Sequence, residues 1–155
     1  MLKRSLLWLI TLLWAIGIFC FSAQPAIESA ALSGKLTKQI VQSLSREKLT
    51  ESELEHIVKK VHRGIRKTAH FFLYLILGVL VFLLFTSYCS QLWYSRFFAL
   101  GTSALYAAGD ELHQHFVPGR SCQFSDVLLD SLGAATGIFL FSLGYFMFKA
   151  FFKKR

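Results

Sequence analysis

The chain has 155 residues, of which 54% are apolar and 17% charged, and its formal net charge is +8. This length is enough for one domain, and the apolar residues gather into runs near the roughly 20 residues that cross a bilayer. Such runs argue against a soluble globular core. No nucleic-acid-binding motif accompanies the basic charge, so we expect no nucleic acid as partner. Cations beside apolar runs instead face anionic membrane lipids.

Four apolar runs predict an all-α fold, a polytopic membrane protein whose single domain, residues 1–155, is a bundle of four transmembrane helices. The runs cover residues 6–23, 69–89, 92–109 and 127–148. The first run is longer than the roughly 7–15 residues of a secretory signal core, which favours a retained span. The third run carries Arg96 near its start, where a long side chain reaches the headgroups.

A basic loop, residues 24–66, lies between the first and second runs and carries two amphipathic patterns. The apolar positions with helical spacing are Leu36, Ile40, Val41 and Leu44, and then Leu54, Ile57, Val58, Val61 and Ile65. Thr50 with Glu53 is typical of a capping box before the second set. We expect two amphipathic helices on the membrane surface, with a lid over the site as the alternative.

Four spans place both chain ends on one side of the membrane and all polar span ends on the other. A plain count of Lys and Arg slightly favours the loop side as cytoplasmic. Both chain ends, however, hold their cations close to a span without acids, whereas the loop dilutes its cations with acids. This pattern favours N- and C-termini in the cytoplasm.

Polar residues gather at the ends of the apolar runs, where ionisable groups are costly and are usually paired or functional. The members are Ser22 and Gln24; Arg66, Lys67, His70 and Tyr74; Asp110, Glu111, His113, Gln114 and Arg120; and Asp126 and Asp130. Spacings of three and four residues give these sets common helix faces, so we expect one membrane-surface site. Interfacial anchoring by Lys67 and Tyr74, and helix capping by Asp126, are the plainer alternatives.

The residue types suggest a division of roles in binding an anionic ligand. Lys67 and Arg120 would pair with the anion, and acids would orient these cations. The acids are Asp110, Glu111 and Asp130, and the expected hydrogen-bonding partners of the ligand are His70, His113 and Gln114. If the site is catalytic, His70 or Glu111 is the candidate general base.

Nitrogen and oxygen donors of this kind also suit a metal ion. The chain has no His-Glu-x-x-His and no Cys/His pattern, however, and its three cysteines form no regular spacing. We therefore expect no metal and no cofactor, and favour a proton relay or a salt-bridged polar core. Gly133 and Gly137 continue the face of Asp130 and predict close packing of the last helix against a neighbour.

The same motifs carry a resemblance over residues 21–140. They are Phe-Ser-Ala-Gln at 21–24, Arg-Lys-Thr-Ala-His-Phe-Phe-Leu-Tyr at 66–74 with a later Gly78, Asp-Glu-Leu-His-Gln-His-Phe-Val-Pro-Gly-Arg at 110–120, and Asp-Val-Leu-Leu-Asp-Ser-Leu-Gly-Ala at 126–134 with Gly137. In this order they resemble the VanZ-like family of small bacterial membrane proteins. The family takes its name from a protein linked to resistance against the glycopeptide teicoplanin.

The resemblance implies a multi-pass protein of the bacterial cytoplasmic membrane with a shared polar site, and raises a role in glycopeptide susceptibility as a hypothesis. Combined with the residues, it predicts binding of an anionic lipid or a lipid-linked cell-wall precursor. Two alternatives stay open: a membrane-embedded transferase or hydrolase that uses His70 or Glu111, and a structural or assembly partner. A small transporter is the least favoured class.

Overall fold

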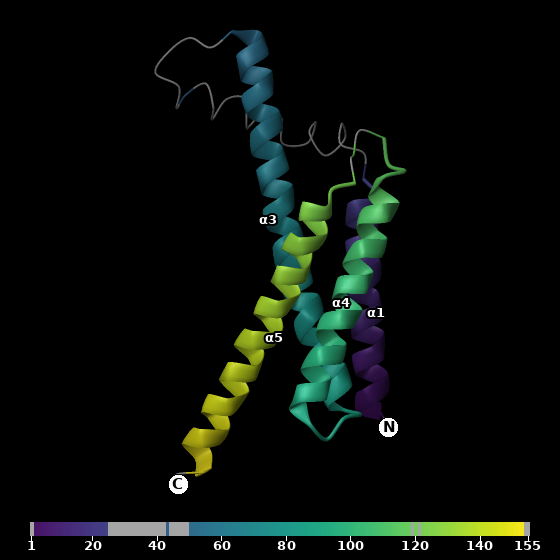
Figure 1. The fold of residues 1–155 in the computed structure, drawn as a ribbon, viewed down its shortest axis with the longest axis vertical. Coiled ribbons are helices and arrows are strands. Elements are labelled where there is room, and N and C mark those ends of the chain that lie inside the picture. The colour runs from purple at the N-terminus through teal and green to yellow at the C-terminus, as the bar shows by residue number, and fades with distance from the viewer. Residues whose placement is uncertain (1, 25–42, 44–49, 119, 121, 154–155) are drawn as a thin grey trace.

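The computed structural model describes residues 2–24, 43, 50–118, 120 and 122–153, and within them it contains four helices and no strand. The helices are α1 (Leu2–Ser22), α3 (Glu51–Thr86), α4 (Leu92–Gln114) and α5 (Phe124–Lys153). They pack side by side along a common long direction (Figure 1). The all-α fold is confirmed. The first predicted amphipathic set, residues 36–44, lies outside the described residues except for position 43.

Helix α3 begins with the predicted capping box. The Thr50 hydroxyl accepts a hydrogen bond from the Glu53 amide, and the Glu53 carboxylate accepts one from the Thr50 amide at 2.9 Å. The helix then continues without a break for 36 residues, because it contains no Pro, and an internal Gly such as Gly64 costs only about 1 kcal/mol. The second amphipathic set is therefore not a separate surface helix but the first part of the helix that holds the second apolar run.

This continuity has a consequence for the membrane. A helix of 36 residues is about 54 Å long at 1.5 Å per residue, whereas the hydrocarbon core is about 30 Å thick. The first half of α3 must therefore extend beyond the core, and Figure 1 shows it rising above the other helices.

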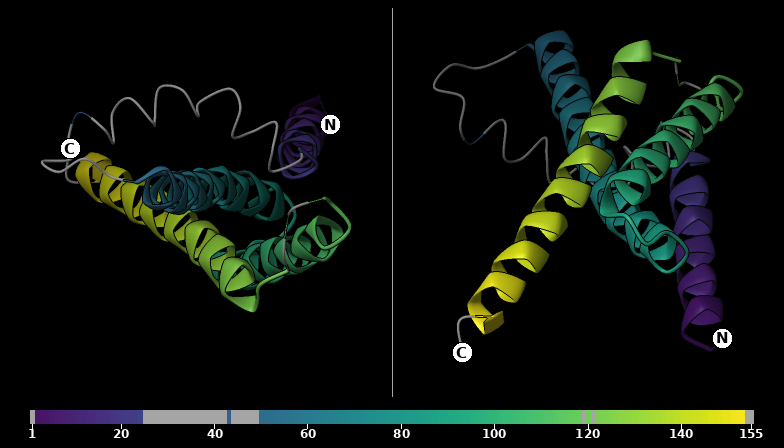
Figure 2. Two further views of the ribbon diagram at one scale, coloured as in Figure 1. Left: turned by 90° about the horizontal axis from the view of Figure 1, so that it is seen from above. Right: turned by 60° about the horizontal axis from the view of Figure 1, so that its bottom comes forward.

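Helix α3 occupies the centre of the bundle and contacts all three other helices, most extensively α5. The two helices run in the same direction and cross (Figure 2). At the crossing their backbones touch, because Cβ atoms added to Gly133 and Gly137 would collide with the carbonyl oxygens of Phe71 and Leu75. A Cβ on Gly78 would likewise collide with the backbone of Ala134.

Three of the helices are long and apolar enough to cross a membrane: α1, α3 and residues Phe124–Lys149 of α5. Helix α4 does not meet that measure, although its 23 residues give it a length of about 35 Å. Its buried stripe is small or polar, made of Ser95, Ala99, Ser103, Ala107, Asp110, Glu111 and Gln114. Its exposed residues include Phe97 and Leu105. Such an inside-out pattern leaves a large apolar surface for lipid or a partner to cover.

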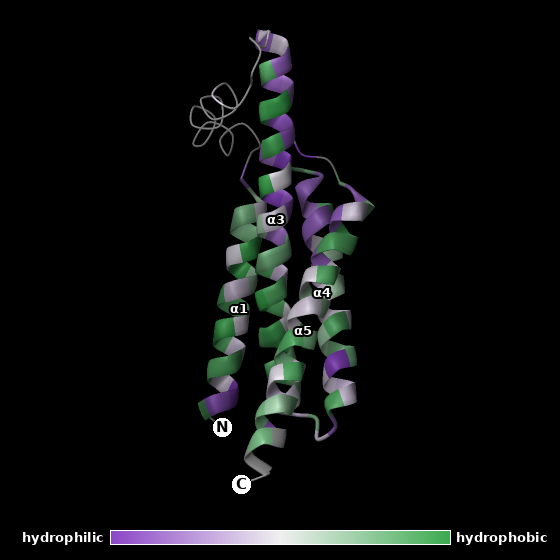
Figure 3. Ribbon diagram, turned by 90° about the vertical axis from the view of Figure 1, so that its left-hand side faces the viewer, coloured by the Kyte–Doolittle hydropathy of each residue, from purple (hydrophilic) through white to green (hydrophobic). Residues whose placement is uncertain are grey.

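The two ends of the bundle differ in character. Both chain termini and the α3–α4 turn lie at one end, and the α4–α5 connection and the last turn of α1 lie at the other (Figure 1). Hydrophilic residues concentrate at the latter end and along the extension of α3 (Figure 3). The polar sets from all four helices therefore meet at one end of the bundle.

A substitution at the α3–α5 crossing tests whether this contact determines the stability of the bundle. We expect Gly137→Ala to lower the stability of the detergent-purified protein by about 1–3 kcal/mol, the usual cost of overpacking, seen as a lower midpoint in thermal unfolding. Gly144→Ala on the same helix is the matched control, because an added Cβ there meets nothing within 4 Å. Equal midpoints for the two variants would show that the contact does not limit stability.

Candidate functional site

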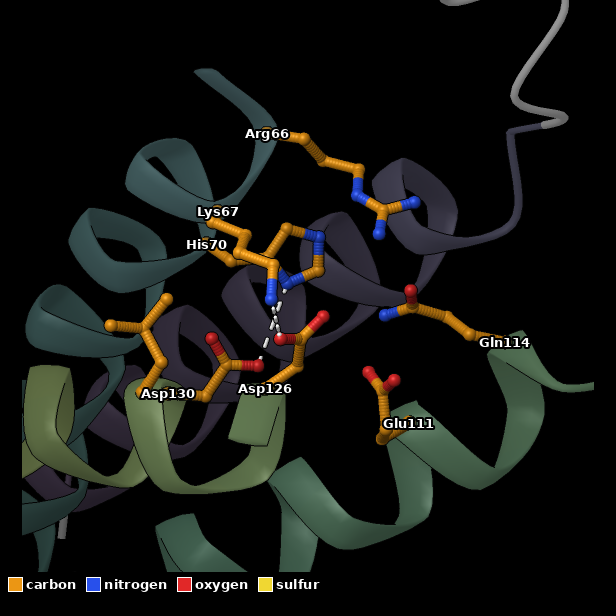
Figure 4. Close-up of a pocket in the computed structure, with 8 residues that line it drawn as sticks. Arg66, Lys67, His70, Glu111, Gln114, Asp126 and Asp130 are labelled. Atoms are coloured by element: carbon orange, nitrogen blue, oxygen red, sulfur yellow. Dashed lines mark hydrogen bonds and ion pairs between the residues drawn. The ribbon is translucent and has the colours of Figure 1, made fainter. Parts of the chain in front are cut away.

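The polar end of the bundle encloses a small cavity between α3, α4 and α5. Its lining residues are Arg66, Lys67, His70, Glu111, Gln114, Asp126, Leu129 and Asp130 (Figure 4). The cavity measures about 10 Å³, which is room for roughly one water-sized particle. Any larger group must therefore bind at its rim, not inside it.

A hydrogen-bond network joins the ends of α1 and α4. The buried Ser22 hydroxyl donates to Asp110 Oδ2 at 2.7 Å, and Gln114 Nε2 donates to the same oxygen at 3.3 Å. Arg120 Nη1 donates to Gln114 Oε1 at 3.2 Å, and its Nη2 donates to the Phe21 carbonyl at 3.5 Å. Arg120, predicted to hold an anion, thus also ties the α4–α5 connection to the bundle.

A second set of contacts joins α3 to the start of α5. Lys67 Nζ forms an ion pair with Asp126 Oδ1 and donates to Gln123 Oε1 at 3.3 Å. The Gln123 amide in turn donates to Glu111 Oε1 at 2.8 Å. Lys67 therefore reaches the cavity with part of its charge already matched by Asp126.

The innermost part of the site lies one helical turn deeper. His70 Nδ1 and Asp130 Oδ2 are 3.6 Å apart, beyond hydrogen-bonding distance. Asp110 approaches from α4, so that His70, Asp110 and Asp130 each offer one ligand atom within 4.8 Å of the others. Among the described residues, this is the group whose geometry could hold a metal ion.

Burial shifts the ionisation of two groups at the rim. Burial raises the pKa of the Glu111 carboxyl above its ordinary value, opposed in part by the hydrogen bond from Gln123. Burial also lowers the pKa of the Arg120 guanidinium, and the nearby charge of Arg66 lowers it further. Both shifts reflect charged forms that are held away from water.

Four predicted ligand-binding residues do not line the cavity: Tyr74, Asp110, His113 and Arg120. The His113 ring packs against Phe19 with centroids 4.2 Å apart, so it faces α1. Tyr74 is fully buried below the cavity, with its ring stacked on His70 at 6.4 Å. The other predicted ligand-binding residues line the cavity.

Two polar residues of the site were not predicted as ligand-binding. Gln123 bridges Lys67 and Glu111, and no spacing signal marks it, because it precedes α5 in an irregular connection. Arg66 lines the cavity beside Lys67, and its place next to Lys67 in the motif was the available signal.

Comparison with known proteins agrees with this picture at the level of the family. A family model described as VanZ/LLP1 matches residues 7–148, so the chain belongs to that family. No curated protein and no solved structure matches the chain.

The Lys67–Asp126 pair can be tested by a double-mutant cycle. Lys67→Met and Asp126→Asn should each destabilise the purified protein by about 1–3 kcal/mol, between the values for exposed and buried pairs, because each leaves a partly buried partner unmatched. The double variant should lose less than the sum of the two. Lys60→Met, an exposed position on α3, is the control. Strict additivity in thermal unfolding would argue against a stabilising pair.

Proposed function

We propose that this VanZ/LLP1 family protein is a four-span protein of the bacterial cytoplasmic membrane whose polar end binds the anionic headgroup of a lipid or lipid-linked cell-wall precursor. Arg66 carries the proposal. Its side chain is half-buried and extends over the cavity (Figure 4). Among the described residues its guanidinium makes no hydrogen bond or ion pair, which leaves its donors for a ligand.

An apolar groove supports an amphiphile as the ligand. It measures about 620 Å³ and lies between α1 and α3, lined by Ile10, Leu13, Trp14, Gly17, Ile18, Phe21, Ala69, Phe72, Leu73 and Ile76. Ala69, Leu73 and Ile76 follow Arg66 on the same face of α3 at spacings of three and four residues. A headgroup on Arg66 would therefore have its hydrocarbon chain in the groove.

The cavity's size agrees with a headgroup at the rim. With room for about one water-sized particle, the cavity cannot take a phosphate-bearing headgroup. Arg66 and Lys67 line the cavity, and Arg120 donates to Gln114, which also lines it. Arginine suits phosphate and carboxylate through its planar fork. The proposal includes a role in glycopeptide susceptibility only if the bound amphiphile is a lipid-linked cell-wall precursor.

Lipid binding can be followed by quenching of Trp14, which lines the groove. In a Trp8→Phe, Trp93→Phe background, brominated phosphatidylglycerol should quench Trp14 more strongly than brominated phosphatidylcholine. Arg66→Ala should weaken the phosphatidylglycerol affinity about 10-fold, since a hydrogen bond to a charged group contributes roughly 1.5–3 kcal/mol. Arg63→Ala, exposed one turn earlier on α3, should leave it unchanged.

A second variant separates the chain from the headgroup. Gly17→Leu would place a side chain into the groove, where an added Cβ meets nothing within 4 Å. It should reduce quenching by both lipids alike. If Arg66→Ala and wild type bind both lipids equally well, the headgroup site is refuted.

Cysteine accessibility tests the topology. Cys122 is exposed and lies in the α4–α5 connection, so in a variant without Cys20 and Cys89 an impermeant thiol reagent should label it in intact cells. Ser90→Cys in a cysteine-free background, exposed in the α3–α4 turn, should react only after the cells are opened. Labelling of both from the same side would contradict four spans, and the reverse pattern would invert the orientation.

A further inference from the structure

Three buried side chains from three helices converge at the floor of the cavity. His70 on α3, Asp110 on α4 and Asp130 on α5 are 5%, 3% and 2% exposed. Each offers one ligand atom within 4.8 Å of the other two. His70 and Asp130 also line the cavity, so this inner group opens toward the rim.

Each of these side chains holds a polar atom that nothing satisfies. Asp110 Oδ2 accepts hydrogen bonds from Ser22 and Gln114, but its Oδ1 has no partner. His70 Nε2, Asp130 Oδ1 and the hydroxyl of the fully buried Tyr74 likewise have no hydrogen-bond partner. Buried polar atoms are nearly always satisfied, because each one left unpaired costs about 1–3 kcal/mol. Four such atoms on neighbouring buried side chains indicate a missing occupant.

The negative charge of the inner group indicates that the missing occupant is a cation. Within the described part of the chain, neither Asp110 nor Asp130 is paired with a Lys or an Arg. The nearby cations lie at the rim, where Lys67 is bound to Asp126 and Arg120 to Gln114. Two buried carboxylates beside one imidazole are strongly unfavourable without a compensating charge.

From this geometry we propose that His70, Asp110 and Asp130 bind a divalent metal ion, with the Tyr74 hydroxyl beside it. Carboxylate oxygens and an imidazole nitrogen are donors that suit Mn²⁺, Fe²⁺ or Zn²⁺. The adjoining cavity of about 10 Å³ has room for roughly one water. Three protein ligands beside a cavity with room for water would suit a reactive metal site better than a structural one, which usually has four protein ligands.

Such an ion would also explain how an end of the bundle rich in acids could bind an anionic headgroup. This consequence rests on the proposed function. Four carboxylates, Asp110, Glu111, Asp126 and Asp130, stand against three cations, Arg66, Lys67 and Arg120. This excess of acid by itself disfavours an anion at the rim. A divalent ion on the inner group would reverse the sign of the total charge at this end of the bundle and so favour an anion at the rim.

Metal binding is tested on the purified full-length protein in detergent, without added lipid. After removal of bound metal with a chelator, Mn²⁺ is titrated and the free ion is followed by electron paramagnetic resonance. We expect about one tight Mn²⁺ per chain and a higher unfolding midpoint with the ion bound. Absence of saturable binding of Mn²⁺ and Zn²⁺ to wild type overturns the proposal and favours a shared proton in the inner group.

Variants show whether the ion occupies this group. Asp130→Asn should abolish tight binding. Tyr74→Phe, which keeps the packing and removes one hydroxyl, should weaken it about 10-fold, as loss of an outer partner of a metal site does. Glu55→Gln, an exposed acid on α3, should bind as wild type does. Unchanged binding in Tyr74→Phe and in folded Asp130→Asn would place the ion elsewhere and refute the site.

Repeating the Trp14 quenching with and without Mn²⁺ separates this inference from the lipid proposal. Stronger phosphatidylglycerol binding with the ion present would support the link between the two sites. Tight Mn²⁺ binding without any effect on lipid affinity would leave the metal site standing and overturn only that link.

Discussion

The contact between the backbones of α3 and α5 is the constraint on which the rest of this structure depends. Gly133 and Gly137 let α5 lie directly on the carbonyl groups of Phe71 and Leu75, and such close approach is the main source of helix association where lipid removes the hydrophobic drive. Because the two helices run in the same direction, a single register brings the polar residues of α3 opposite those of α5. That register sets Lys67 against Asp126 and His70 against Asp130.

The helices reverse the usual arrangement of a soluble protein, because polar side chains lie inside and large apolar side chains lie outside. The inner stripe of α4 carries Ser95, Ser103 and Asp110, while large apolar side chains such as Leu105 point outward. In a hydrocarbon environment this arrangement is favourable, since lipid covers the apolar surface and the polar groups satisfy one another inside. At the polar end, however, some buried polar atoms have no hydrogen-bond partner. At the rim Lys67 is paired with Asp126, whereas the inner group retains oxygen and nitrogen atoms without a hydrogen-bond partner.

The residues of the proposed site also form a network that stiffens this end of the bundle. Ser22, Asp110 and Gln114 form a buried network that fixes the end of α1 to α4, and a network of that kind needs no ligand to be stabilising. The unpaired atoms of His70, Asp110 and Asp130 lie next to it. The network therefore holds Asp110 in a fixed position with one oxygen free of hydrogen bonds, as the proposed metal site would require.

The sequence alone determined the local features of this protein. Hydrophobic runs and the Thr50–Glu53 pair gave the helical class and the start of α3, because periodicity and capping depend only on neighbours along the chain. Span lengths also predicted that the polar sets would share one end. The motif residues further indicated the family, which the match over residues 7–148 confirms.

Tertiary structure decided which of these residues face one another. His113 and Asp110 are three apart, yet His113 packs on Phe19 while Asp110 points inward, because residues three apart differ by about 60° around a helix and the rotation of α4 is set by its neighbours. The continuity of α3, the bridge through Gln123 and the meeting of His70 with two aspartates from other helices depend on interhelix packing. No spacing within a single helix encodes that packing, so only the folded bundle could reveal the inner group.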